Sequence, residues 1–228
     1  MFGKECVVLK LISEFLDTPA SSEADHRIAN HLSLITSLLH LQTRALSESK
    51  SFSREDAVWL LDDCGRRIET VARVHRLLAA RADRRARIDV CDYLHDVAVS
   101  IVESTAVRGK YVLNSDCDHG CRIGADHVAS LGLLVGELVT NAVKYAHPAG
   151  VRGAITLLCA GAADNSTILT ISDDGVGLPE GFDPATKGNL GFRMIRSLVQ
   201  RLRGEIAFDS SSLGLKVTLR IPNSEGSH

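Results

Sequence analysis

Two long helical stretches lie in the first third of the chain, and the spacing of their apolar residues predicts how they pack. From about residue 22 to 47, one row advances in steps of four and three through Ile28, Leu32, Ile35, Leu39, Gln42 and Leu46. A second apolar row lies beside it, through Leu34, Leu38, Leu41 and Ala45. A helix with two such rows needs more than one neighbour, which favours a four-helix bundle over a two-stranded coil.

The second helix is predicted over residues 54–82, after a polar break at 47–53. Its inward-facing residues are expected to be Val58, Leu61, Ile68, Val71, Val74 and Leu78. One hairpin supplies only two helices to a four-helix bundle, so a homodimer is expected to complete it. A shorter amphipathic helix precedes the hairpin and ends at Pro19.

The pattern changes from residue 88 onward, where short β-branched runs alternate with helical stretches. The expected order is strand 88–90, helix 91–107, strands 111–114 and 121–123, helix 126–145, strands 153–160 and 167–172, helix 190–203, and a closing hairpin of 205–209 and 216–221. Helices and antiparallel strands in this order predict a two-layer α/β sandwich. The fold class is therefore α+β, with an N-terminal helix at 1–20, a helical hairpin at 21–86 and a second domain at 87–228.

Composition and charge indicate which partners and which cellular location are expected for this protein. The formal net charge of −2 gives no indication of nucleic-acid binding. No uninterrupted apolar stretch is long enough to cross a membrane, so no membrane span is expected. The N-terminal segment carries Lys4, Glu5, Lys10 and Glu14 and lacks a clean apolar core, so a secretory signal is not expected either. We therefore expect a cytoplasmic location, in which thiols stay reduced.

The six cysteines are interpreted as packed thiols. Four of them are isolated in the sequence and are expected to be small core residues: Cys6, Cys64, Cys91 and Cys159. Cys117 and Cys121 flank His119, which suggests a zinc clip. A structural zinc site usually needs four ligands, and no second ligand pair follows nearby, so packing is favoured over metal binding.

Three short motifs carry candidate chemistry. The first is ELVTNAVK, in which Glu137, Asn141 and Lys144 stand at i, i+4 and i+7 and share one helix face. A carboxylate, an amide oxygen and an ammonium on one stripe suit a hydrated Mg²⁺ that is bound to phosphates. A solvent-facing polar stripe, with a Glu–Lys pair that stabilises the helix slightly, is the alternative interpretation.

The second and third motifs are glycine-rich. DDGVGLP, from Asp173 to Pro179, follows a strand directly; its glycines let backbone approach a ligand, and its carboxylate can accept from an adenine amino group. KGNLG, at positions 187–191, immediately precedes a helix, where exposed N–H groups favour phosphate oxygens. Residues 178–187 between them are expected to form a mobile lid.

In this order, ELVTNAVK, DDGVGLP and GNLG resemble the N, G1 and G2 boxes of the GHKL ATPases, the superfamily of histidine kinases, gyrase-type topoisomerases and Hsp90-like chaperones. The resemblance covers about residues 126–222 and implies a Bergerat-fold site for ATP and Mg²⁺. It implies Asn141 on Mg²⁺ and Asp173 on adenine. The other nucleotide-binding residues that it implies are Lys144, Gly175, Gly177, Gly188, Leu190 and Gly191.

The helical third resembles one kind of histidine kinase. EADHRIANHL, from Glu23, followed by SLLHLQ, is similar to the phosphoacceptor box of the HWE-related kinases, which carry His-Arg at this point. The strict HWE signature has a His before the N-box Glu and a Trp-x-Glu near the G1 box. Here Gly136 precedes Glu137, and the only tryptophan is Trp59. The chain therefore looks like the sister group, which has the same His-Arg acceptor box. The resemblance implies that His26 takes a phosphoryl group from ATP and passes it to an aspartate in the receiver domain of a response regulator.

The helical periodicity agrees with an exposed His26. With Ile28 at zero and about 100° per residue, the first apolar row falls within roughly 40° of zero, whereas His26 falls at roughly 160°. On the same scale Asn30 lies close to His26, at roughly 200°. His31 falls at roughly 300°, within the apolar arc. His26 is therefore expected on the flank of the bundle, as a phosphorylated imidazole must be.

The residues around the acceptor suggest further roles. Arg27 occupies the place of the acidic neighbour found in other kinases, and it is expected to steady the phosphoryl group or the partner's acidic pocket. Asp25 and Glu137 are both candidates for the proton acceptor, and the match of Glu137 to the N box favours it. Asn30 is expected to position a water for dephosphorylation of the partner.

Three other functions remain open from the sequence: a histidine phosphotransferase or response-regulator phosphatase with a largely non-catalytic ATP domain, a GHKL serine kinase, and a structural dimerisation module. The segment before the acceptor helix is too short for a sensor domain. The signal is therefore expected to come from a separate sensor protein, from the N-terminal helix, or from a part that lies outside this sequence.

Overall fold

The computed structural model describes residues 33, 36, 53–82, 90–104, 109–118, 121, 123, 125–186 and 190–223. The chain divides into two compact units, residues 1–75 and 76–228. Among the described helices, none combines the length and the apolar character that a membrane crossing requires.

Helix α3 (Arg54–Ala82) has the bounds that the apolar pattern predicts. Cys64, Val71 and Val74 are buried, as expected. Val58, Leu61 and Ile68 are 52%, 70% and 41% exposed in the single chain, and their burial in a bundle completed by a second chain stays a prediction.

Five strands form one sheet in the order β1-β2-β3-β5-β4. Their bounds are Tyr111–Cys117 for β1, Gly153–Gly161 for β2, Ser166–Asp173 for β3, Glu205–Ser211 for β4 and Gly214–Pro222 for β5. Along β2, Ile155 and Leu157 are buried, whereas Leu158 is 42% exposed. This alternation shows that only one face of the sheet is covered.

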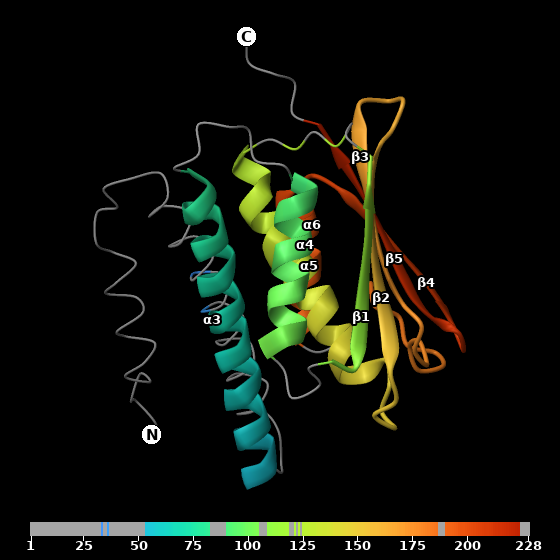
Figure 1. Cartoon of the computed structure of the whole chain (residues 1–228). Helices are drawn as coiled ribbons and strands as arrows, with labels where there is room; N and C mark the ends of the chain where they lie inside the picture. The colour runs from blue at the N-terminus through green and yellow to red at the C-terminus, as the bar shows by residue number, and fades with distance from the viewer. Residues whose placement is uncertain are drawn as a thin grey trace. The chain divides into compact units, whose positions relative to one another are not determined.

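Three helices cover that face: α4 (Val90–Ser104), α5 (Ala125–Tyr145) and α6 (Leu190–Arg201), with α5 packed between the other two (Figure 1). Residues 128–139 of α5 are buried on all sides because this helix lies between its neighbours and the sheet. The predicted two-layer sandwich is therefore confirmed. The helix expected at 126–145 and the strands expected at 153–160 and 167–172 are confirmed with small differences at their ends.

Three local predictions need correction. Val90, expected to end a strand, instead begins α4; residues 88 and 89 lie outside the described residues. No strand forms at Cys121 or Ile123, because β1 is longer than expected and its ladder ends where the Asp118 N–H donates to the Cys159 carbonyl at 2.8 Å. The sheet is also not wholly antiparallel: β1 and β2 run parallel, since α5 carries the chain back between them.

A glycine sets the packing of α4 on α5. Tyr93 of α4 is fully buried, and a Cβ on Gly132 of α5 would overlap its hydroxyl group. Neither helix can move away without opening the core, because protein interiors are packed close to crystal density. The interface therefore requires the smallest residue at position 132.

We expect Gly132→Ala to lower the free energy of unfolding by about 1–3 kcal/mol, the usual cost of overpacking. Gly65→Ala is the matched control, because nothing lies within 4 Å of a Cβ built on Gly65 of α3. That control should be neutral or stabilising by about 1 kcal/mol, from helix propensity alone. Urea unfolding of the two variants checks this, and equal effects would contradict the packing argument.

Candidate nucleotide-binding site

The polar face of α5 carries the first group of candidate residues. Glu137 is only 4% exposed, and Asn141 and Lys144 are half-buried on the following turns. The Nδ2 atom of Asn141 is buried and has no hydrogen-bond partner among the described residues. This face is therefore not the solvated polar stripe of the alternative interpretation, and the Asn141 amide is available to a ligand.

Asp173 ends β3, and backbone groups hold its half-buried carboxylate. Its Oδ1 atom accepts from the Gly175 N–H at 3.0 Å and from the Leu215 N–H at 3.4 Å. Burial raises the pKa of Asp173 above its usual value, although those two backbone donors and His147 oppose the shift. A carboxylate that is fixed through one oxygen and partly desolvated is suited to accept a hydrogen bond from a neutral amino group.

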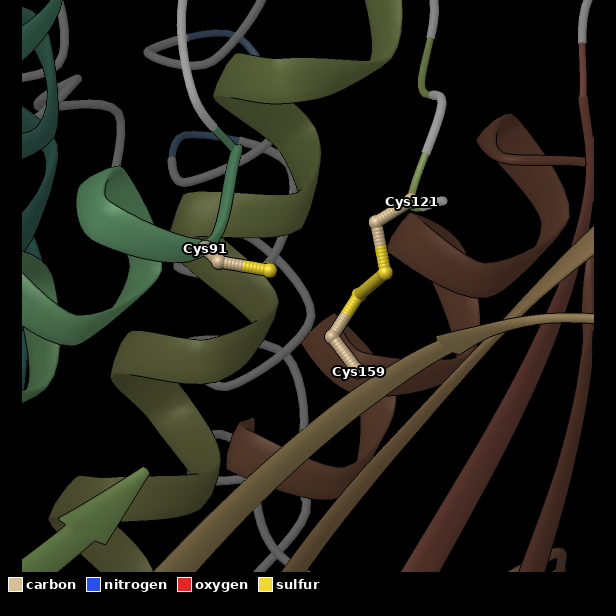
Figure 2. A group of neighbouring side chains, drawn as sticks. All are labelled: Cys91, Cys121 and Cys159. Carbon is tan, nitrogen blue, oxygen red and sulfur yellow. A yellow bond between two sulfur atoms is a disulfide. The ribbon is translucent and has the colours of Figure 1, made fainter. Parts of the chain in front are cut away.

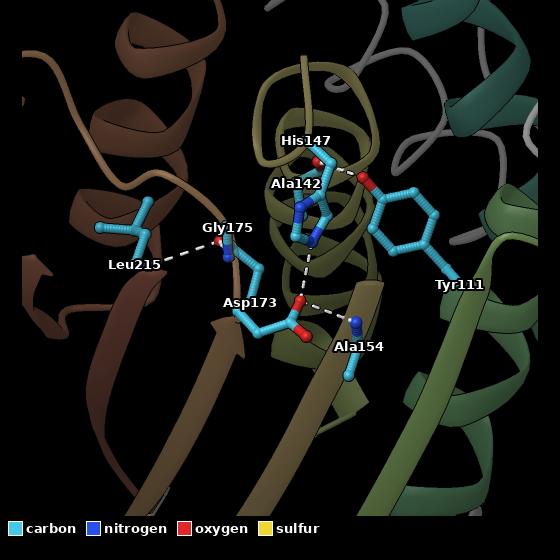
Figure 3. Close-up of polar contacts among 8 residues, drawn as sticks. Tyr111, Ala142, His147, Ala154, Asp173, Gly175 and Leu215 are labelled. Carbon is cyan, nitrogen blue, oxygen red and sulfur yellow. Dashed lines mark hydrogen bonds and ion pairs between the residues drawn. The ribbon is translucent and has the colours of Figure 1, made fainter. Parts of the chain in front are cut away.

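The next residue, Asp174, joins three elements, and two of its partners, His147 and Ala154, are labelled in Figure 3. Its Oδ1 atom lies 2.8 Å from Nε2 of His147, just beyond α5, and accepts from the Ala154 N–H of β2 at 2.8 Å. Burial opposes ionisation of Asp174, but these contacts outweigh it and hold the pKa of Asp174 below its usual value. The sequence motif contained Asp174, but nothing in the sequence indicated that His147 would be its partner.

Tyr111 of β1 supports the same corner of the site. Its hydroxyl donates to the Ala142 carbonyl of α5 at 3.3 Å, and its ring lies 5.7 Å from the His147 ring, centre to centre. Burial raises the pKa of the Tyr111 phenol, and the nearby carboxylates of Asp173 and Asp174 raise it further. The phenol therefore stays protonated near neutral pH and remains a donor.

Two glycines allow the loop after β3 to lie against the end of α5. A Cβ on Gly175 would overlap backbone atoms of Ala146, and the next residue, Val176, donates its N–H to the Ala146 carbonyl at 2.9 Å. Gly177 has φ +69°, and a Cβ there would overlap the Ser211 carbonyl. These glycines are therefore required by the backbone of the site itself.

The segment between the second and third motifs is described through Thr186 and is anchored to α6. The ring of Phe182 contacts that of Phe192 of α6 in a tilted arrangement, with centroids 5.2 Å apart. Phe192 in turn contacts Phe208 of β4 in the same way, at 6.0 Å. Arg196 of α6 donates to the Pro184 carbonyl at 2.7 Å. Whether this segment acts as a lid stays a prediction.

The structure brings Asn141, Lys144, Asp173, Gly175 and Gly177 to one end of the sandwich, where α5 and β3 both end. Gly191 is buried in the first turn of α6, and Leu190 begins that helix. Gly188 lies outside the described residues, as do His26, Arg27 and Asn30. The residues that sequence reasoning missed are Tyr111, His147 and Ser210, whose Oγ accepts from the Leu178 N–H at 2.7 Å.

The one-faced sheet, the carboxylate at the end of β3 and the amide on the facing helix agree with an ATPase domain of the GHKL class, which the three motifs resemble. Two family models match the chain: histidine kinase over residues 23–105, and histidine kinase-, DNA gyrase B- and HSP90-like ATPase over residues 126–225. Over these two ranges the chain is similar to histidine kinases.

Relatives and solved structures agree with this assignment. Blue-light-activated histidine kinase 2 of Erythrobacter litoralis is 29% identical over 208 residues, which are 90% of this chain and 57% of that protein. Sensor histidine kinase PdtaS of Mycobacterium tuberculosis is 30% identical over 88% of this chain and 38% of its own length. The solved E. litoralis EL346 blue-light activated histidine kinase has a TM-score of 0.67 and 26% identity, over 91% of this chain and 62% of that one. This chain thus spans less than two thirds of each of these proteins.

The linkage between Asp174 and its partners should appear in the pH dependence of stability. Because the folded-state pKa of Asp174 lies below the ordinary 3.8, its contribution is present above 3.8 and is lost as the pH falls through the lowered value. We expect Asp174→Asn to be less stable than wild type at pH 7 by about 1 kcal/mol or less, because the group is exposed.

Urea unfolding between pH 7 and pH 3 checks this expectation. The difference between wild type and Asp174→Asn should shrink toward the acid end of the series. Asp116→Asn, an exposed aspartate on the edge strand β1, is the control and should show no such convergence. A difference that stays constant to the lowest pH would contradict the proposed contacts.

Proposed function

We propose that this chain is an ATP-dependent protein-histidine kinase of a two-component system. It phosphorylates His26 from Mg-ATP and passes the phosphoryl group to an aspartate in the receiver domain of a response regulator. The proposal rests on the hydrogen bond of 2.9 Å that the Val176 N–H donates to the Ala146 carbonyl. This bond fixes the loop after Asp173 to the end of the helix that holds Asn141. Adenine and phosphate recognition are thereby held at one end of one domain.

In the proposed site, Asp173 accepts from the exocyclic amino group of adenine. Its Oδ1 atom already holds two backbone N–H groups, which leaves Oδ2 for the base. Gly175 and Gly177 let backbone lie close to the nucleotide. Gly188, Leu190 and Gly191 surround the phosphates at the start of α6, because the N-terminal end of a helix favours anions.

Mg²⁺ fits the donor set on α5. Amide oxygen and carboxylate oxygen are the ligands that Mg²⁺ prefers, and the buried Asn141 amide has an end without a partner among the described residues. Because the oxygen and nitrogen of an amide are assigned by their contacts, the oxygen can take the free position. We propose that Asn141 holds the ion and Lys144 contacts the phosphates. The bound ion offsets charge on the transferring group.

Residues of α5 and of the predicted acceptor helix are proposed to assist the phosphoryl transfer. We propose Glu137, one turn before Asn141, as the group that accepts the proton when the imidazole of His26 attacks the γ-phosphate in line. Arg27 steadies the phosphorylated imidazole. Asn30, one turn further, positions water for dephosphorylation of the partner.

A homodimer is part of the proposal. The exposed row on α3, made of Val58, Leu61 and Ile68, supports it, because a second hairpin would cover that row and complete a four-helix bundle. The use of ATP and of a receiver-domain partner favours the cytoplasm, the location that we propose.

Autophosphorylation tests the central claim. Purified wild type incubated with magnesium and γ-labelled ATP should acquire acid-labile label, and His26→Ala should acquire none. His40→Ala is the matched control on the same predicted helix and should be labelled like wild type. Asn141→Ala should slow labelling by about tenfold or more, because it removes a metal ligand.

Three results would contradict this proposal. Label on another protein with none on His26 would indicate a serine kinase. Wild type that takes up no label but dephosphorylates a receiver domain would indicate a phosphatase with a non-catalytic ATP domain. Folded dimer with neither activity would indicate a structural module.

Nucleotide binding tests Asp173 separately from the chemistry. We expect Asp173→Asn to weaken ATP binding by roughly 10- to 100-fold, because the loss of a hydrogen bond to a charged group costs about 1.5–3 kcal/mol. Since the raised pKa shows that the fold disfavours the ionised form, the variant should not be less stable than wild type at pH 7.

Titration calorimetry with ATP and urea unfolding measure the two quantities. Asp116→Asn, an exposed aspartate on β1, is again the control and should bind ATP like wild type. Unchanged ATP affinity in folded Asp173→Asn would remove the carboxylate from adenine recognition.

A further inference from the structure

Three cysteines that are far apart in the sequence meet between the helix layer and the sheet (Figure 2). Cys91 lies in the first turn of α4, Cys121 follows β1, and Cys159 lies in β2. Their sulfur atoms all lie within 4.8 Å of one another. Cys121 and Cys159 form a disulfide, so the prediction that both are packed, reduced thiols is wrong.

The disulfide accounts for only two of these sulfur atoms. The Cys91 side chain points from α4 toward the Cys121–Cys159 bond (Figure 2). Cys159 is 2% exposed, whereas Cys91 and Cys121 are half-buried, so the cluster is partly shielded from water but can be reached from it. The start of a helix also favours negative charge, which suits a thiolate at Cys91.

A fourth cysteine lies one strand away. Cys117 of β1 is the register partner of Cys159 in β2, so both side chains leave the same face of the sheet. Cys117 and Cys121 stand four positions apart, a spacing within the range that is common for paired zinc ligands. The fold therefore brings Cys91 of α4 and Cys159 of β2 to Cys121, two ligands that the sequence did not place beside it.

We propose that Cys91, Cys121 and Cys159, once reduced, bind a soft divalent metal ion, zinc, as thiolates. Tetrahedral Zn–S bonds of about 2.3 Å separate sulfur atoms by about 3.8 Å, a spacing that this cluster reaches with small side-chain movements. Cys117 or water completes the coordination. Zinc binding ties the first helix of the ATP-binding unit to its sheet, independently of the nucleotide site.

The disulfide and the metal-bound form exclude each other. A dithiol reductant supplies two electrons and two protons to the Cys121–Cys159 bond and is itself oxidised to a disulfide. Zinc then displaces the protons of the three thiols. In the reverse direction, hydrogen peroxide takes two electrons from the Cys121 and Cys159 thiolates and becomes water with two protons, the disulfide forms again and the zinc is released.

The test uses the full chain. The chain is reduced with a phosphine, which carries no thiol, and the phosphine is removed before zinc is added. Zinc affinity and stoichiometry are measured by competition with a chromophoric chelator, and cobalt substitution reports thiolate ligation by its charge-transfer absorption. The variants are Cys91→Ser, Cys91→Ala as a second substitution in case the first does not fold, and Cys64→Ala as control. Cys64 is a buried thiol on α3, outside the cluster.

We expect wild type and Cys64→Ala to bind about one zinc per chain with a cobalt–thiolate band, and peroxide to release it. Either Cys91 variant should bind zinc at least about tenfold more weakly, while peptide mapping without reductant still finds the Cys121–Cys159 disulfide. The proposal is overturned if reduced, folded wild type binds no zinc, or if the folded Cys91 variants bind zinc as wild type does. It is also overturned if peroxide forms the disulfide without releasing zinc.

Discussion

The close approach of the loop after β3 to the end of α5 is the contact on which the rest of the candidate site depends. The Val176 N–H donates to the Ala146 carbonyl at 2.9 Å, and this is possible only because Gly175 has no side chain to strike Ala146. Through this contact the helix with Asn141 and the strand that ends at Asp173 become one frame. A larger residue at position 175 would separate the two halves of the site without touching a ligand.

The environments of the adjacent residues Asp173 and Asp174 shift the pKa values of their carboxyl groups in opposite directions. Asp174 faces water and binds His147 and the Ala154 N–H, so its charge is stabilised and it joins β2 to the segment after α5. Asp173 is half-buried, and burial disfavours its charge. Because Asp173 is partly desolvated, its position depends on contacts made by its neighbours. Asp174, His147 and Tyr111 make these contacts.

The cysteine cluster lies in the same unit but has a separate physical basis. It depends on the β1–β2 register, which places Cys117 beside Cys159, and on the packing of α4, which brings Cys91 to them. Any ion or disulfide here acts on the helix-to-sheet interface rather than on the nucleotide corner. The kinase proposal and the zinc proposal can therefore fail or succeed independently.

The sequence by itself determined the elements whose patterns are local: the full length of α3, the apolar helix α5, the β2–β3 pair and the glycines after β3. It also indicated Asn141 and Asp173, because their motifs are short and contiguous. Only the tertiary structure decided the parallel β1–β2 pair, the exposure of Val58, Leu61 and Ile68 in one chain, the contact of His147 with Asp174, and the meeting of Cys91, Cys121 and Cys159. The physical reason is that periodicity records only which face of an element is apolar. The contact of His147 with Asp174 joins residues 27 positions apart, and the disulfide joins residues 38 positions apart. Such contacts depend on register and packing, which no local pattern encodes.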